Sequence, residues 1–557
     1  MNALRMGLSV CVLVACRVDG HYEFPERHAL TVQVGGSGLG SVSSEPPGLT
    51  CSAGTCSGEF FDGTEVRLSA SATTGSFLGW TEACRGQGEC TVTMDRDQVM
   101  GALFGTPGEA LWARQLGSEE SDYGKAIAVD SDNNLIAVGA FSRTISAGSE
   151  LTSNGGLDIY VVKLAGSTGS ITWAKRFGST LSDLGTNYYD DVFGVTADRS
   201  NNVYITGIFA GTVDFGGGPL TVPMGEQAVF VLKLDADGSF GWARKIDGHG
   251  FAYPGGVAGD RGSIATDGDS VVIAGKFNRM TIDTTMLTSA GESDPDIFAL
   301  KMSASTGATI WVKRFGGIEP EYAKGVALDG NGDVVLTGEF QGTVDFGGGS
   351  LSSDYGNGFL LKLADANGAH LLSKQLGSPS APCNAIAVDP ANNILVTGTF
   401  LGTVDFGCTN RPTASQAGVR DVFLVKYTQA GACIWAKGFG GTAAMSTSRS
   451  ATSIAVNSSG EVSIAGAFSG SISFGGETLL SASLAPDVFA ARFAGDGRHL
   501  SSVRSGGTSA DYGLGIAQSS DGRVFVTGQF EGFAEFGSGA FNSSGREDAF
   551  IVGFAPL

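Results

Sequence analysis

Tyrosines and carboxylates that could bind a ligand gather in several polar loops of this 557-residue chain. These candidates are Tyr123, Tyr188, Tyr189, Asp190, Asp191, Tyr253, Tyr322 and Tyr512. Aromatic faces combined with hydrogen-bond acceptors can hold a sugar or a basic peptide. Tyr123, Tyr322 and Tyr512 also occupy equivalent positions of an internal repeat, and we favour packing at the entry to each repeat unit as the explanation for these three.

Four cysteines near the N-terminus are spaced as Cys51-x4-Cys56 and Cys84-x5-Cys90. In an exported chain this spacing favours two local disulfides. A four-cysteine zinc site is the alternative, but such sites usually contain Cys-x2-Cys pairs, and no histidine suited to zinc lies nearby. Three further cysteines, Cys383, Cys408 and Cys433, form an odd-numbered group. One thiol could stay free, and the sequence leaves open which two pair.

Aspartate-rich turns invite a calcium interpretation, most of all Asp329-Gly-Asn-Gly-Asp333. Hairpin formation explains them better, because tight turns require Asp, Asn and Gly, and Phe340 stands where an EF-hand loop needs Glu. The Asp-Phe-Gly copies at Asp214, Asp345 and Asp405 match a kinase motif by chance. We expect their Phe side chains to pack between repeat units.

Recognisable catalytic and cofactor motifs are missing from the sequence. Its five histidines form no His-x3-His pair, and it has neither Gly-x-Ser-x-Gly nor Gly-x4-Gly-Lys-Ser/Thr. We therefore expect no catalytic residue, no metal site and no cofactor.

The composition indicates an all-β protein. Glycine accounts for 86 residues, and short alternating stretches such as Val-Tyr-Ile-Thr-Gly recur along the chain. The formal net charge is −21, with only 35 Lys and Arg residues. This balance opposes binding to DNA or RNA, which requires a basic surface. An acidic surface most often serves solubility.

The N-terminus has the features of a bacterial lipoprotein signal. Residues 1–15 place Arg5 before an apolar stretch that is too short to span a bilayer. The following Leu13-Val-Ala-Cys16 resembles a lipobox, which implies lipidation of Cys16; an ordinary secretory signal is the alternative. Residues 16–28 are predicted to form a tether. The resemblance implies a protein of the bacterial envelope, at the outer membrane or cell surface, that meets the membrane through its lipid alone.

Residues 29–106 are predicted to form a small β-rich module. Its strand patterns lie at Leu30–Val34, Val66–Ala70, Cys90–Met94 and Met100–Phe104. Together with Phe77-Leu-Gly-Trp80 and the four cysteines, they resemble the divergent internalin-B-type bacterial repeat. That resemblance implies a grasp-like spacer or presentation module and no activity.

Residues 110–557 contain seven copies of one repeat. Each copy has a strand such as Ala126-Ile-Ala-Val-Asp130, a strand ending in Gly-x-Phe and a strand such as Asp158–Leu164. A fourth strand, of the type Trp-Ala-Lys-Arg-Phe-Gly and degenerate in places, follows the first six copies. The glycines of the second motif are Gly139, Gly207, Gly275, Gly338, Gly398, Gly466 and Gly528.

The position of the fourth strand predicts a closed ring. Its first copy, Leu111 to Leu116, precedes the first repeat, and the seventh repeat ends without one. The early copy can complete the last unit, which predicts a seven-bladed β-propeller of four-stranded blades rather than an open solenoid. The motifs Ile-Ala-Val-Asp, Val-x-Val-Thr-Gly-x-Phe and Thr-Val-Asp-Phe-Gly resemble the SBBP-type β-propeller repeat and, more distantly, the NHL repeat. This resemblance implies a scaffold only.

These features predict a noncatalytic surface or envelope lipoprotein whose propeller binds an unknown protein or glycan. One alternative is an extracytoplasmic hydrolase or lyase that uses loop carboxylates such as Asp190 and Asp191. Another is a purely structural component of the envelope.

Overall fold

The computed structural model describes residues 26–36, 38–82, 84, 89–106, 108–180, 189–248, 252–254, 263–291, 294–377, 380–414, 416–441 and 449–556, with the backbone alone at 81–82 and 252–254. Within these ranges the regular structure consists of strands β1 to β47. The described residues accordingly include no helix long and apolar enough to cross a membrane. The all-β class expected from the composition is confirmed.

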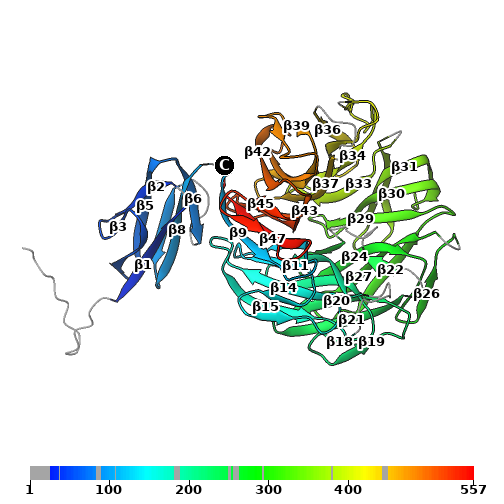
Figure 1. The fold of residues 1–557 in the computed structure, drawn as a ribbon, viewed down its shortest axis with the longest axis horizontal. Coiled ribbons are helices and arrows are strands. Elements are labelled where there is room, and N and C mark those ends of the chain that lie inside the picture. The colour runs from blue at the N-terminus through cyan, green and yellow to red at the C-terminus, as the bar shows by residue number, and fades with distance from the viewer. Residues whose placement is uncertain are drawn as a thin grey trace, which may run out of the picture.

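Strands β1 to β8 form two four-stranded sheets that share one apolar core. The first sheet has the order β4 (Gly54–Phe61), β1 (Arg27–Gly35), β8 (Gln98–Gly105) and β6 (Ser76–Glu82). The second has the order β3 (Thr50–Cys51), β2 (Leu39–Glu45), β5 (Thr64–Thr74) and β7 (Cys90–Met94). Figure 1 shows this module in blue beside a disc of blades. The regular elements of its described residues are all strands.

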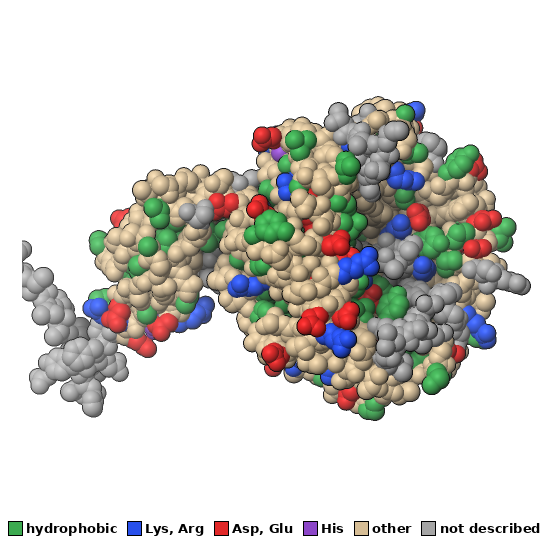
Figure 2. Space-filling model, in the orientation of Figure 1, with side chains coloured by type: hydrophobic (Ala, Val, Ile, Leu, Met, Phe, Trp, Pro, Cys, Tyr) green, Lys and Arg blue, Asp and Glu red, His purple; other side chains and the backbone are tan. Residues whose placement is uncertain are grey.

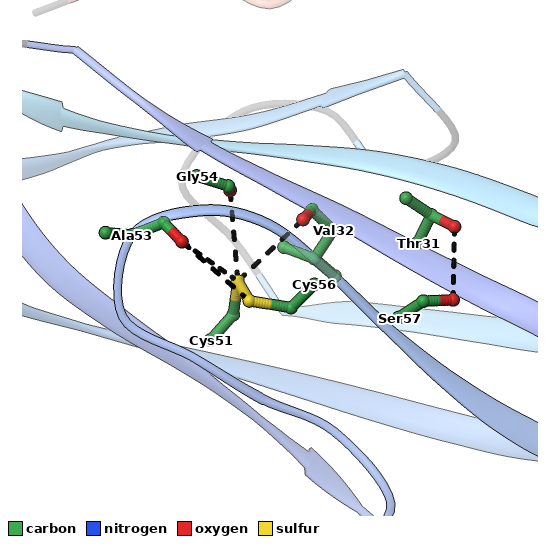
Figure 3. Close-up of a disulfide and its surroundings, with 7 residues drawn as sticks. All are labelled: Thr31, Val32, Cys51, Ala53, Gly54, Cys56 and Ser57. Carbon is green, nitrogen blue, oxygen red and sulfur yellow. Dashed lines mark hydrogen bonds between the residues drawn. A yellow bond between two sulfur atoms is a disulfide. The ribbon is translucent and has the colours of Figure 1, made fainter.

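Two disulfides join the sheets of this module, as the cysteine spacing predicts. Cys51 of β3 bonds to Cys56 of β4, and Cys84 bonds to Cys90 of β7. Figure 3 shows the first bridge beneath β1, with the Cys51 sulfur 3.8 Å from the carbonyl oxygen of Val32. Each bridge spans a point where the chain passes from one sheet to the other, so both hold the two sheets together.

The remaining strands build seven four-stranded antiparallel blades, numbered 1 to 7 along the chain. The first strands are β10 (Tyr123–Val129), β16 (Asp191–Ala197), β22 (Ala252–Pro254) with β23 (Ile264–Thr266), β29 (Glu321–Leu328), β33 (Cys383–Val388), β37 (Arg449–Val456) and β43 (Asp511–Gln518). The second strands are β11 (Leu135–Phe141), β17 (Val203–Phe209), β24 (Ser270–Phe277), β30 (Val334–Asp345), β34 (Ile394–Phe400), β38 (Val462–Phe468) and β44 (Val524–Phe530). The third strands are β14 (Asp158–Leu164), β20 (Ala228–Leu234), β27 (Asp296–Ser303), β31 (Ser350–Leu363), β35 (Asp421–Tyr427), β41 (Asp487–Phe493) and β47 (Asp548–Phe554).

The fourth strands run along the outside of the disc (Figure 1). They are β15 (Ile171–Phe177), β21 (Phe240–Gly248), β28 (Thr309–Phe315), β32 (His370–Leu376), β36 (Cys433–Phe439), β42 (His499–Gly507) and, in blade 7, β9 (Ala110–Leu116). Short hairpins extend the second-to-third connections of five blades. They are β12 (Thr144–Ser146) with β13 (Glu150–Thr152), β18 (Thr212–Asp214) with β19 (Pro219–Thr221), β25 (Arg279–Ile282) with β26 (Thr285–Thr288), β39 (Ser471–Ile472) with β40 (Leu479–Leu480), and β45 (Phe533–Glu535) with β46 (Ala540–Asn542).

The blades form a closed ring, so the fold is the seven-bladed β-propeller predicted from the repeats. The first strand of each blade contacts the first strands of both neighbours, and β10 of blade 1 meets β43 of blade 7. β47 pairs antiparallel with β9, with Ala549 opposite Leu116. The early strand therefore completes the last blade.

Packed phenylalanine rings fill the space between blades. Phe215, from the Asp-Phe-Gly copy of blade 2, lies 4.8 Å from Phe230 of its own blade and 5.5 Å from Phe177 of blade 1. Asp214 accepts hydrogen bonds from the backbone N–H groups of Gly216 and Gly218. The motif is thus a turn followed by a core side chain, as expected.

Candidate functional site

The fourth-to-first and second-to-third connections meet on one side of the propeller, here called the loop face. Asp122, just before β10, shows how they meet. Its carboxylate accepts hydrogen bonds from the N–H of Ser118 in the first kind of connection, at 2.5 Å, and of Ser142 in the second, at 3.0 Å. Figure 2 shows basic, acidic and apolar side chains close together around the middle of one face of the disc.

Four buried carboxyl groups take this same position at the entry of their blades: Asp122, Asp190, Glu321 and Asp511. Burial raises the pKa of Asp122, Asp190 and Asp511 to about 7 and that of Glu321 to about 8, because it outweighs the backbone hydrogen bonds that favour the ionised form. Asp190, one of the predicted ligand residues, accepts hydrogen bonds from Ser179 and Ala210. Asp190 therefore connects the loop that enters blade 2 to the end of the second strand of that blade.

Asp191 is held by a neighbouring blade. Its carboxylate lies 3.0 Å from the Nζ of Lys125, and both side chains are almost fully buried. Lys125 is the extra residue of a β-bulge in β10. The bulged residues Asn384 and Thr452 likewise donate hydrogen bonds to the first strand of the next blade. Sequence reasoning missed this role, because a bulge has no distinctive residue type.

The predicted tyrosines occupy the inner rim of the loop face, defined here as the loop-face ends of the first strands. Tyr123, Tyr322 and Tyr512 stand one residue after the buried carboxyl groups, opposite Ala140, Glu339 and Gln529. Tyr123, Tyr189 and Tyr322 are half-buried, and Tyr512 is 37% exposed. The backbone of Tyr253 in β22 lies opposite Lys276. The side chain of Tyr253, like Tyr188 and Cys16 as a whole, lies outside the described residues.

Lysines lie over two of these rings. The Nζ of Lys125 is 5.0 Å from the ring centre of Tyr123, and the Nζ of Lys276 is 5.0 Å from that of Tyr322. Both distances are within the range of a cation–π interaction. The inner rim is therefore a place where this protein already pairs aromatic faces with ammonium groups.

Large apolar side chains are exposed on the connections that form the loop face. Met224 is 97% exposed, and Ile318, Tyr355 and Leu484 are more than two-thirds exposed. Met224, Ile318 and Leu484 belong to second-to-third or fourth-to-first connections, whereas Tyr355 lies within β31. These side chains offer apolar contact area on the loop face.

The opposite face carries the Asp-rich turns. Asp329 accepts the N–H groups of Asn331 and Asp333, and it forms a 2.7 Å ion pair with Lys362. These contacts are those of a hairpin turn. A cavity of about 670 Å³ lies beside Asp267 and Asp329. Within the described ranges, no three His, Cys, Asp or Glu side chains are placed to hold a metal ion.

The fifth blade settles the cysteine pairing that the sequence left open. Cys408 bonds to Cys433 at the start of β36, and Cys383 is a buried free thiol. Burial raises the pKa of Cys383 to about 12, so the thiol form persists at neutral pH.

Comparison with known proteins finds distant similarity. No family model matches the chain. An uncharacterised WD repeat-containing protein of Acanthamoeba polyphaga mimivirus is 23% identical over 399 residues, which cover 59% of this chain and 28% of that protein. The chain therefore spans less than a third of this relative's length.

Two solved structures align with this chain at low similarity. Sqt1 from Chaetomium thermophilum is 11% identical with a TM-score of 0.37, covering 81% of this chain and 99% of that one. Quinohemoprotein alcohol dehydrogenase from Comamonas testosteroni is 10% identical with a TM-score of 0.32, covering 80% and 76%. The chain is thus a β-propeller protein with distant similarity to a WD-repeat protein.

Proposed function

We propose that this chain is a noncatalytic envelope lipoprotein whose propeller binds a protein or glycan through the loop face. Lipidation of Cys16, the SBBP-type character of the blades and the internalin-B-type character of the module belong to this proposal. The module would then serve as a spacer between the lipid and the propeller.

One observation carries the proposal. The half-exposed tyrosines of the inner rim and the exposed apolar side chains of the connections lie on one face, while Asp190 and Asp191 are engaged in internal contacts. Aromatic and apolar groups of this kind supply contact area to a ligand. The internal partners of the two carboxylates favour binding over hydrolysis as the role of this face.

The test is a binding screen of the full chain, without its lipid, against glycan and envelope-protein arrays. Any hit is then measured with the triple variant Tyr123→Ala, Tyr322→Ala, Tyr512→Ala, and with Phe61→Ala as the control, because Phe61 is 45% exposed but lies in β4, outside the propeller. We expect the triple variant to weaken binding at least tenfold and the control to leave it unchanged. A hit that is insensitive to the triple variant would move the site elsewhere, and a screen without hits would favour a structural role.

A further inference from the structure

Blades 4 and 7 place a tyrosine in the same surroundings. Tyr322 follows the buried carboxyl group of Glu321 and faces Glu339, whereas Tyr512 follows Asp511 and faces Gln529. Burial and neighbouring carboxylates raise the pKa of both phenols. For Tyr322 the carboxylates are Glu339, Asp294 and Glu321, and for Tyr512 they are Glu547, Asp511 and Glu531.

In blade 4, two lysines of the chain itself balance this negative charge. Lys276 comes from the second strand of blade 3 and places its Nζ 5.0 Å from the ring centre of Tyr322. Lys324, the bulged residue of β29, lies 3.4 Å from Glu339. The Tyr322 ring and the Glu339 carboxylate therefore each have a lysine of this chain as a cationic partner.

In blade 7, both lysine positions are apolar. Ala467 follows Gly466 in β38 as Lys276 follows Gly275 in β24, and Leu514 is the bulged residue of β43. The two strands are close here, since a Cβ on Gly513 would lie 2.9 Å from the carbonyl oxygen of Gly466. In the described part of the chain, no cation lies over the Tyr512 ring, and neither Glu531 nor Glu547 forms an ion pair. Glu547 accepts a hydrogen bond from Gln529, the residue opposite Tyr512, over 3.0 Å. Both glutamates are half-exposed.

The connection beside Tyr512 adds an apolar contact. Ser483 donates a hydrogen bond to the carbonyl oxygen of Thr508, at the entry to blade 7, over 2.9 Å. The next residue, Leu484, is exposed. The N–H of Asp511 also donates to the carbonyl oxygen of Pro486 over 2.8 Å, so the connection that carries Leu484 runs beside the residue that precedes Tyr512. An apolar side chain on this connection suits a polypeptide better than a small free amine.

We propose that Tyr512, Glu531 and Glu547 bind the cationic side chain of a lysine or arginine from a polypeptide partner, which takes the place that Lys276 fills beside Tyr322. An ammonium or guanidinium group is the chemistry that an aromatic face flanked by carboxylates attracts. This inference rests on the proposed function, because it names the partner class for part of the same loop face.

The experiment is a selection of random displayed peptides on the full chain in 0.15 M salt. We expect selected sequences to be enriched in Lys or Arg next to an apolar residue. The dissociation constant of a selected peptide is then measured with Ala467→Lys, which restores the lysine of blade 3 at the equivalent position. We expect it to rise at least tenfold, and to rise similarly with Tyr512→Leu.

The matched control is Thr399→Lys. Thr399 and Ala467 follow the equivalent glycines Gly398 and Gly466, and both are 7% exposed. This variant adds the same charge at the same repeat position in blade 5. In the next blade, blade 6, the position that corresponds to Tyr512 is occupied by Ser450. Thermal unfolding of each variant establishes that it is folded.

Two results would overturn the inference: a selected pool without Lys or Arg, or equal affinities for Ala467→Lys and Thr399→Lys, which would show nonspecific attraction to an acidic protein. Either result leaves the proposed function intact if a glycan or protein still binds in a manner that depends on the three tyrosines.

Discussion

The indole Nε1 of Trp112 donates a hydrogen bond to the carbonyl oxygen of Gly166 over 3.0 Å. Trp112 lies in β9, which completes blade 7, whereas Gly166 lies in the turn after the third strand of blade 1, so the bond crosses the junction where the ring closes. The same bond recurs between consecutive blades from Trp173 to Ala236, Trp242 to Ala304, Trp311 to Asp365 and Trp435 to Gly495. The tryptophan of the repeat therefore links neighbouring blades by a hydrogen bond.

Replacement of Trp112 by Phe should weaken the closing junction. The change removes the N–H donor and leaves a carbonyl group short of its partner, so the free energy of unfolding should fall by about 1–3 kcal/mol. Urea unfolding measures this value. The comparison is Trp311→Phe, which removes the same bond between blades 3 and 4, away from the closing junction. If neither variant lowers the free energy of unfolding, the bond does not contribute to stability.

Replacement of Lys125 by Met should destabilise the contact between the first strands of blades 1 and 2. Asp191 would remain buried without its partner, and breaking one side of a buried ion pair typically costs about 3–5 kcal/mol. The double variant Lys125→Met, Asp191→Leu removes both charges and should lose less. A double variant that is as unstable as the single one would contradict this explanation.

Replacement of Tyr160 by Phe should be harmless or favourable. Tyr160 is fully buried, and its hydroxyl has no hydrogen-bond partner among the described residues. The equivalent residue in the other blades is phenylalanine, as in Phe230, Phe298 and Phe359. We expect the free energy of unfolding to stay the same or to rise by about 1 kcal/mol.

The control is Tyr427→Phe, because the Tyr427 hydroxyl donates to the carbonyl oxygen of Phe406 over 2.9 Å. This variant should lose about 1 kcal/mol. If Tyr160→Phe loses as much as the control, its hydroxyl must have a partner in solution.

Stability should decrease as the pH rises from about 4 to about 8. Asp122, Asp190 and Asp511 have a folded-state pKa of about 7 against 3.8 unfolded, and Glu321 has about 8 against 4.5. The folded chain binds more protons than the unfolded chain in this window, so its extra stability is present at low pH and is lost as the pH passes the folded-state values. The midpoint of thermal unfolding, measured from pH 5 to pH 8.5, should fall by a few degrees.

Asn at position 122 imitates the neutral acid, so Asp122→Asn should reduce the slope of this profile. A midpoint that rises steadily over the same range would contradict the raised pKa values.

The strands were predictable because each blade repeats two simple signals. Alternating or fully apolar runs bounded by Gly, Asn and Asp mark the strands, and β14 and β20 span the very residues expected, Asp158–Leu164 and Ala228–Leu234. Ring closure was also predictable, because the fourth strand is displaced to the start of the repeat region. Local pattern and chain order thus suffice for the architecture.

The contacts between blades could not be predicted from the sequence. Lys125 meets Asp191 because a bulge turns its side chain toward the next blade, and no local pattern shows that direction. Which two of Cys383, Cys408 and Cys433 pair likewise depends on which strands place sulfur atoms together. The role of Asp190 as an internal acceptor also requires the positions of two loops.

The strand that closes the ring also constrains the order in which the propeller can fold. Gln115 of β9 and Asp548 of β47 are hydrogen-bonded although they stand 433 positions apart, so the first strand of the propeller to be made must wait for the last. Until then β9 has no neighbour in its blade, and an unpaired strand edge is a template for association with other chains. In a chain that is still being synthesised or exported, β9 would therefore be a site of aggregation. Protection of β9 during synthesis would then increase the yield of the closed propeller.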